Sequence, residues 1–234
     1  MTPDELRIAG FLDPRRALSF FEELPGGAEA WERDLGASAD PDQALLAAIR
    51  LHEADPGLVR GLVDKPDARR RVCAVLGGSQ WLGDYVIAYP ARAVSIWEDP
   101  GQSRQVLLAS VGATRAEGGA YVAAEGASAD DLRAAYRRVL LSVAADDLTS
   151  EDPEALMPEV GRRIADLVDA TLEAGLALAR RDIDPQGQTP FAIIAMGKTG
   201  ARELNYISDV DVVYVAQAGV DQDEGVALEV ATRL

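Results

Sequence analysis

Cysteine and histidine are almost absent from this sequence of 234 residues, which contains one of each, Cys73 and His52. A single cysteine excludes an internal disulfide and fits a reducing compartment, so the chain is expected in the cytoplasm. Without a second histidine or clustered thiols, a zinc site has no support. Cys73 is expected to be a small core residue, and His52 a packed or solvated one.

Basic side chains and long apolar runs are also scarce. There are 23 basic residues against 39 acidic ones, which gives a net charge of −16. Such a field repels phosphate backbones, so nucleic acid is not an expected partner. No apolar run approaches the ~20 residues of a membrane span, and the charged N-terminus lacks a signal-peptide core, so no membrane partner is expected. Apolar residues still make up 48% of the chain, enough for a sizeable core.

Helical periodicity dominates the first three quarters of the chain. Proline follows a residue suited to a helix start at residues 13–14, 40–41, 55–56 and 65–66. Stronger helices are predicted from Asp130-Asp131 onward and from about Val160 to Arg180. The glycine-rich tract between them, residues 110–129, is expected to be a loop or a ragged helix end. This pattern is typical of a bundle of short antiparallel helices.

Two apolar runs of strand length follow a turn at residues 184–187, with the sequence Asp-Pro-Gln-Gly. They predict strands at about residues 190–196 and 210–216, and no strand is expected before the turn. The turn therefore marks the expected domain boundary, between a helical region (1–185) and the beginning of a second domain (186–234). The expected fold class is mainly α with a small α/β part.

Two carboxylates, Asp209 and Asp211, open the second apolar run. In a strand they share a face, roughly 6–7 Å apart at Cα. Mg²⁺ prefers one or two carboxylates together with water and substrate phosphates, and a glycine such as Gly197 lets backbone approach a phosphate closely. A bare Asp-x-Asp is usually a solvated strand end. Here the neighbouring residues are apolar on both faces of the expected strand, which predicts a strand that is covered on both sides. Unpaired carboxylates in such a strand would need a cation.

Several neighbouring residues admit more than one interpretation. Gly197-Lys198-Thr199 has the ending of a P-loop, but that motif needs a glycine where this sequence has Ala192, so a P-loop nucleotide-binding protein is the weaker alternative. Lys198 either contacts a phosphate or is a solvated turn lysine. Ser208 either binds a phosphate or caps a turn.

The same stretch resembles a known family signature. Gly197-Lys198-x-Gly200-x-Arg202-Glu203-Leu204-Asn205-Tyr206-x-Ser208-Asp209-x-Asp211 resembles that of glutamine synthetase adenylyltransferase/adenylyl-removing enzymes, which are polymerase-β-like nucleotidyltransferases. Upstream segments at residues 76–84 and 132–138 are similar to segments of that family as well. Two departures are Thr199, where a leucine is usual, and Ala201, where a glycine is usual. Neither departure removes a metal ligand.

The resemblance implies the N-terminal, adenylyl-removing half of an enzyme that regulates glutamine synthetase in nitrogen metabolism. That half would remove AMP from a tyrosine by phosphorolysis, giving ADP, while the other half would add AMP from ATP. The implied cofactor is Mg²⁺, and the implied partners are glutamine synthetase, ATP or ADP, and phosphate. The site residues expected here are Asp209 and Asp211 as catalytic metal ligands, with Gly197, Lys198 and Ser208 for the nucleotide or phosphate.

The family places a third metal carboxylate on a later strand, which is expected beyond residue 234. The sequence is thus expected to be the truncated beginning of the nucleotidyltransferase domain, inactive alone. Its last helix should leave an apolar face uncovered, formed by Val226, Leu228, Val230 and Leu234. An alternative function, which is not that of an enzyme, is a noncatalytic helical docking module with a vestigial nucleotide site.

Overall fold

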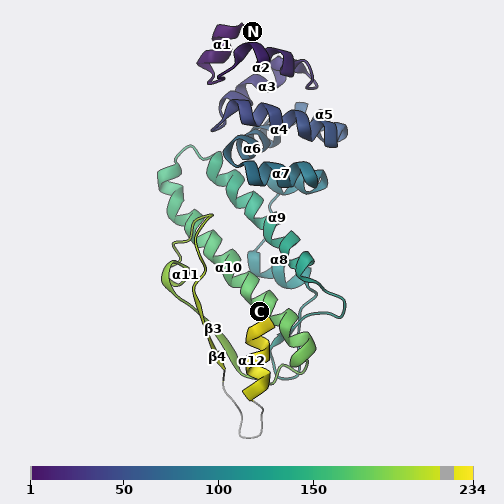
Figure 1. Cartoon of the computed structure of the whole chain (residues 1–234), viewed down its shortest axis with the longest axis vertical. Coiled ribbons are helices and arrows are strands. Elements are labelled where there is room, and N and C mark those ends of the chain that lie inside the picture. The colour runs from purple at the N-terminus through teal and green to yellow at the C-terminus, as the bar shows by residue number, and fades with distance from the viewer. Residues whose placement is uncertain (1, 217–223, 234) are drawn as a thin grey trace. The chain divides into compact units, whose positions relative to one another are not determined.

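The computed structural model describes residues 2–216 and 224–233 (Figure 1). The fold is mainly helical, as predicted, and the described residues form two antiparallel sheets of two strands each. The chain divides into two compact units. The first comprises Met1–Asp99 with Leu141–Glu154, and the second comprises Pro100–Leu140 with Ala155–Leu234. The domain boundary near residue 185 stays a prediction.

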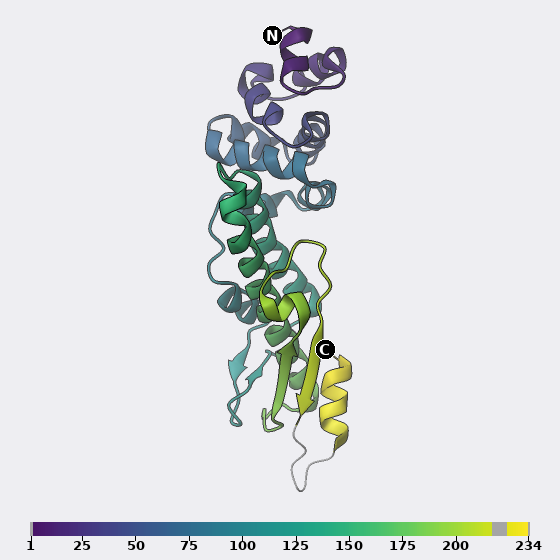
Figure 2. The ribbon, with the colours of Figure 1, turned by 90° about the vertical axis from the view of Figure 1, so that its left-hand side faces the viewer.

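The first unit is built from short helices, and Figure 2 shows them turned by 90° from the view of Figure 1, several of them end-on. Their bounds are α1 (Pro3–Ile8), α2 (Pro14–Phe21), α3 (Gly27–Gly36), α4 (Pro41–Ala54), α5 (Pro56–Val63), α6 (Pro66–Gly78), α7 (Gln80–Ala88) and the 3₁₀ helix η1 (Pro90–Ile96). Each predicted proline start is confirmed. Three of them carry an aspartate cap, whose carboxylate accepts a backbone N–H of the first turn: Asp13, Asp40 and Asp55.

Aromatic rings and a buried ion pair form the core of the first unit. The rings of Phe11 and Phe21 meet edge to face, and Trp31 donates its indole N–H to the Pro25 carbonyl at 2.8 Å. Arg69 stacks on Trp31 and pairs with Asp34 at 2.6 Å. Further core side chains are fully buried, namely Leu6, Leu35, Leu45, Leu51, Leu62 and Leu76.

The single cysteine and an exposed tryptophan also belong to this unit. Cys73 is buried, as predicted, and burial raises the pKa of its thiol, so it stays protonated. Trp81, in contrast to Trp31, is 55% exposed and is not a core residue. The unit is completed from a distant part of the sequence, because Arg71 pairs with Asp146 at 2.7 Å.

The second unit carries the strands. Its elements are α8 (Ser103–Ser110), β1 (Thr114–Arg115), β2 (Tyr121–Val122), β3 (Phe191–Ala195), α11 (Gly197–Ala201), β4 (Val212–Ala216) and α12 (Glu224–Arg233). Two long helices, α9 (Ala129–Leu148) and α10 (Pro153–Ile183), each have residues in both units. No helix among the described residues is both long and apolar enough to cross a membrane.

For residues 110–160 the structure corrects two expectations and confirms one, the helix from Asp130-Asp131 onward. A short hairpin, with Thr114 opposite Val122, occupies part of the tract expected to be a loop, so strands do occur before residue 185. Helix α9 starts from a cap by Ser128, whose hydroxyl accepts the Asp131 N–H at 3.2 Å. Helix α10 begins at Pro153 rather than near Val160 and runs through Pro158.

The hairpin is fixed to the turn at residues 184–187. Gly118 donates its N–H to the Gln186 carbonyl at 2.8 Å, and Ala123 donates to the Ala177 carbonyl of α10 at 3.0 Å. A Cβ on Gly118 would lie 2.2 Å from the Gly187 carbonyl oxygen, which is an impossible contact. The backbones of two distant segments can therefore meet only because residue 118 is glycine.

Helix α12 is better covered than its sequence suggested. Val230 is 1% exposed, and Arg233 pairs with Asp182 at 2.9 Å. The prediction of an uncovered apolar face is therefore wrong for Val230. The side chain of Leu228 and the whole of Leu234 lie outside the described residues.

We expect Gly118→Ala to lower the free energy of unfolding by about 1–3 kcal/mol, because the new methyl group forces the hairpin away from Gly187. Urea titration followed by circular dichroism measures this. The control is Gly61→Ala in α5, where a Cβ meets nothing within 4 Å and alanine should stabilise the helix. An unchanged urea midpoint for Gly118→Ala would contradict the close contact.

Candidate functional site

The two halves of the sequence motif meet at one end of the β3–β4 pair. The strands are antiparallel, with Ala195 opposite Val212, and Met196 donates its N–H to the Asp211 carbonyl at 2.9 Å. The glycine turn after β3 and the carboxylates before β4 therefore lie side by side. Asp209 and Asp211 precede β4 rather than lying within it, which differs from the predicted Asp-x-Asp strand.

The carboxylate of Asp211 lies beside Gly197, close to where a side chain would begin. The φ of Gly197 is +51°, a left-handed conformation that favours glycine, and a Cβ there would lie 3.1 Å from Asp211 Oδ2. Any side chain at this position would crowd the carboxylate. The structure thus brings together two of the predicted site residues, and α11 starts at an exposed glycine beside the carboxylate.

The carboxylates themselves face solvent. Asp209, Asp211 and Lys198 are all exposed. The expectation that the strand is covered on both faces is wrong for the described residues, because Val213 and Val215 on β4 are 48% and 50% exposed. The argument that burial alone demands a cation therefore does not hold here. What supports a metal is the donor set, two accessible carboxylates beside a glycine backbone.

A complete cage of ligands is not present in the part of the chain that the structure describes. Within that part, no group of three or more His, Cys, Asp or Glu side chains could hold a metal ion. Asp209 and Asp211 would supply two ligands, and water and substrate oxygens would have to supply others.

Ser208 is engaged in the turn that precedes the carboxylates. Its hydroxyl accepts the Asn205 N–H at 3.1 Å and donates to the Asn205 side-chain oxygen at 2.9 Å. The Ile207 N–H donates to that same oxygen. Of the two roles left open by the sequence, this geometry favours the turn cap, and it places Ser208 one residue before Asp209.

The P-loop alternative does not agree with the local fold. Residues 191–195 form β3 and pair along their whole length with β4. A P-loop would instead need a phosphate-wrapping loop in the residues before Gly197. Gly197 begins α11 directly after the strand, with Met196 as the cap.

The segment that joins α11 to the carboxylates is held against α10. Arg202 forms ion pairs with Asp166 and Asp169, and its hydrogen bond to Asp166 is the main cause that raises its pKa. Leu204 is buried, and its carbonyl oxygen would lie 3.4 Å from a Cβ on Gly161 of α10. Sequence reasoning could not assign a partner to Arg202, because Asp166 and Asp169 are distant in the chain.

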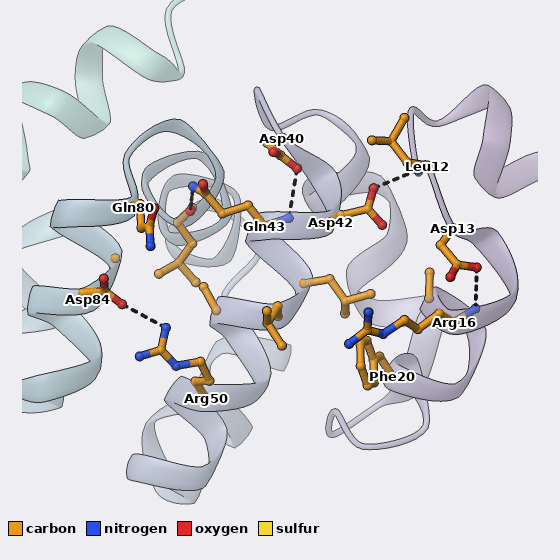
Figure 3. A pocket seen from close by; sticks show the side chains of 16 residues that line it. Leu12, Asp13, Arg16, Phe20, Asp40, Asp42, Gln43, Arg50, Gln80 and Asp84 are labelled. Atoms are coloured by element: carbon orange, nitrogen blue, oxygen red, sulfur yellow. Dashed lines mark hydrogen bonds and ion pairs between the residues drawn. The ribbon is translucent and has the colours of Figure 1, made fainter.

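A separate pocket of about 430 Å³ lies within the first unit, among α2, α4 and α7 (Figure 3). Its polar groups are largely engaged with one another. Arg50 pairs with Asp84 at 2.8 Å, Asp42 accepts the Leu12 N–H at 2.7 Å, and Gln43 donates to a backbone carbonyl of α6. None of the residues predicted for the metal and phosphate site lines it.

The family of the chain follows from comparison with known proteins. The family model described as "Glutamate-ammonia ligase adenylyltransferase" matches residues 69–234. The chain belongs to this family. No solved structure matches this adenylyltransferase-family chain.

Curated relatives agree with the family assignment. Proteins named "Bifunctional glutamine synthetase adenylyltransferase/adenylyl-removing enzyme" are 38% identical in Cutibacterium acnes over 90% of this chain, and 39% identical in Streptomyces avermitilis over 96%. A Bifidobacterium longum relative of the same name is 36% identical over 98% of the chain. The chain spans only 22% of the first two relatives and 23% of the third.

The departure at Thr199 has a structural consequence in this member of the family. Thr199 is 2% exposed, and its hydroxyl oxygen has no hydrogen-bond partner among the described residues. A buried hydroxyl without a partner loses its hydration without compensation.

We therefore expect Thr199→Val, which keeps the shape and removes the hydroxyl, to raise the free energy of unfolding by about 1 kcal/mol. The matched control is Thr171→Val in α10, because the Thr171 hydroxyl donates to the Leu167 carbonyl at 2.7 Å. The free energy of unfolding of that variant should not rise. Urea unfolding of both proteins decides, and equal effects would show that the Thr199 hydroxyl is not the cause.

Proposed function

We propose that this chain contributes the adenylyl-removing site of a glutamine synthetase adenylyltransferase/adenylyl-removing enzyme. The reaction removes AMP from a tyrosine of glutamine synthetase by phosphorolysis. The observation that carries the proposal is the closeness of the Asp211 carboxylate to the Gly197 backbone, at the same end of the sheet as Lys198 and Asp209. The Gly197 backbone, the Lys198 ammonium group and the two carboxylates therefore lie at one place, where a phosphoryl group could be held.

The donor set fits Mg²⁺, which Asp209 and Asp211 would hold together with substrate oxygens. The ion would neutralise charge on the transferring phosphoryl group. Lys198 is exposed at the same turn and would contact a phosphate oxygen. Because Gly197 has no side chain, its exposed backbone would be accessible to a phosphate oxygen beside the Asp211 carboxylate.

The reaction requires no side-chain nucleophile. An oxygen of inorganic phosphate attacks the phosphorus of the AMP group, and the new P–O bond makes ADP. The bond to the tyrosine oxygen breaks, and that oxygen takes up a proton to restore the hydroxyl. What these residues of the chain contribute is therefore alignment and charge, in a site that carries two acidic ligands and one lysine.

In the full-length gene product, we expect Asp209→Asn and Asp211→Asn each to lower the rate of AMP removal by at least about 100-fold, because a lost carboxylate removes both charge and orientation at the metal. Release of ADP from adenylylated glutamine synthetase measures the rate. The control is Asp130→Asn, an exposed aspartate of the second unit that pairs only with Arg133 in the described structure. Near wild-type rates in both site variants would overturn the metal assignment.

The 234-residue chain alone is expected to release no measurable ADP, because two carboxylates leave the metal short of ligands. Incubation with adenylylated glutamine synthetase, phosphate and Mg²⁺ tests this. Steady ADP release that disappears in Asp211→Asn would show that these two carboxylates suffice. Nucleotide titration with and without Mg²⁺ tests the docking-module alternative, since such a module would show no metal-dependent nucleotide binding.

A further inference from the structure

Arg202 lies where the chain leaves α11 and turns toward the two carboxylates. Its backbone has φ 60° and ψ 38°, and it is the one non-glycine residue with positive φ in the described part of the chain. A Cβ disfavours this left-handed conformation, which glycine adopts without steric cost. The backbone alone would therefore be better served by glycine, and the reason for an arginine has to lie in its side chain.

That side chain reaches across to α10. One terminal nitrogen of the guanidinium donates to Asp166, and the other donates to Asp169 at 3.2 Å. The two aspartates are three residues apart and share a face of the helix, where like charges repel. Arg202 neutralises both at once, and we call this three-residue arrangement the Arg202 clamp.

The clamp is one of several contacts that hold the segment from residue 203 to residue 211. Next to it, the backbone of residues 202–204 lies over Gly161 of α10, and Leu204 is 3% exposed. The turn from Asn205 to Ser208 follows and is closed by its own hydrogen bonds. The chain then reaches Asp209 and Asp211, and Met196 donates its N–H to the Asp211 carbonyl.

The clamp is poorly placed to contribute to global stability. The side chains of Arg202, Asp166 and Asp169 are 41%, 57% and 49% exposed. Exposed ion pairs are weakened by solvent and contribute little to folding. The guanidinium of Arg202 donates to two separate carboxylates from one rigid plane, and this limits the positions that the residue can take relative to α10.

We propose that Arg202 is a positioning residue, whose grip on Asp166 and Asp169 holds residues 203–211 so that the Asp211 carboxylate lies against Gly197. The inference rests on the proposed function, since it assigns the clamp to the metal and phosphate site. Arg202 itself touches no reacting group. It acts through the segment that carries Asp209 and Asp211.

The decisive variant is Arg202→Gly, because glycine keeps the left-handed turn and removes only the clamp. We expect its urea midpoint to stay close to that of the wild-type chain. Amide hydrogen exchange of residues 203–211 should become faster, and the dissociation constant for Mn²⁺ should rise at least about tenfold. Arg202→Lys can pair with one carboxylate but not with both. Its exchange rate and its dissociation constant for Mn²⁺ should therefore lie between those of the wild-type chain and Arg202→Gly.

The matched control is Arg162→Ala, which removes an equally exposed α10 ion pair, with Glu159, and should change neither exchange nor Mn²⁺ affinity. Unchanged exchange and affinity in Arg202→Gly would overturn the proposal, as would a loss of global stability, which would mark the role as structural. If the wild-type chain binds no more Mn²⁺ than Asp211→Asn, the proposed metal site fails instead. Hydrogen exchange then still decides whether the clamp holds the segment.

Discussion

A buried arginine anchors the segment that leads from α10 into β3. Arg180, near the end of α10, donates to Asp184 at 2.7 Å and to the Thr189 carbonyl at 2.8 Å, and both side chains of the pair are at most 6% exposed. Asp184 in turn accepts the N–H groups of Gln188 and Thr189. Burial lowers the pKa of Arg180, which Asp184 partly offsets. Removing either partner would leave an uncompensated buried charge, which costs about 3–5 kcal/mol.

Three of the contacts that support the site come from α10. Its end directs β3 through Arg180, its middle contacts residues 202–204 at Gly161, and its exposed face holds Arg202 through two aspartates. The glycine turn and the carboxylates therefore approach each other on a common support, although they belong to separate segments of the chain. A rigid helix that supports both sides is the arrangement that a phosphoryl-transfer site needs, since catalysis there depends on alignment.

Sequence reasoning succeeded where the cause of structure is local. Aspartate caps and a proline in the first turn fix a helix start within four residues, and these starts are confirmed at Asp13, Asp40 and Asp55. It failed where the cause is distant in the chain. The hairpin at residues 114–122 depends on Gly118 meeting Gly187, and no periodicity within the hairpin shows that contact.

The same distinction applies to the site. The motif that contains Gly197 and Asp211 predicted that they belong to one site, and the antiparallel pairing of β3 with β4 is what brings them together. The exposure of β4 could not be predicted, since an apolar alternation states what a strand can bury and not what covers it. The roles of Ser208 and Arg202 depended on Asn205, Asp166 and Asp169, which only the folded chain places beside them.

The interleaving of the two units in the sequence has a consequence for synthesis of the chain on the ribosome. The first unit includes Leu141–Glu154, which carry the Asp146 partner of Arg71. Between its two parts the ribosome adds residues 100–140, which belong to the other unit. The N-terminal helices must therefore wait, incompletely packed, until residue 154 has emerged, so this unit cannot finish folding in simple order from the N-terminus.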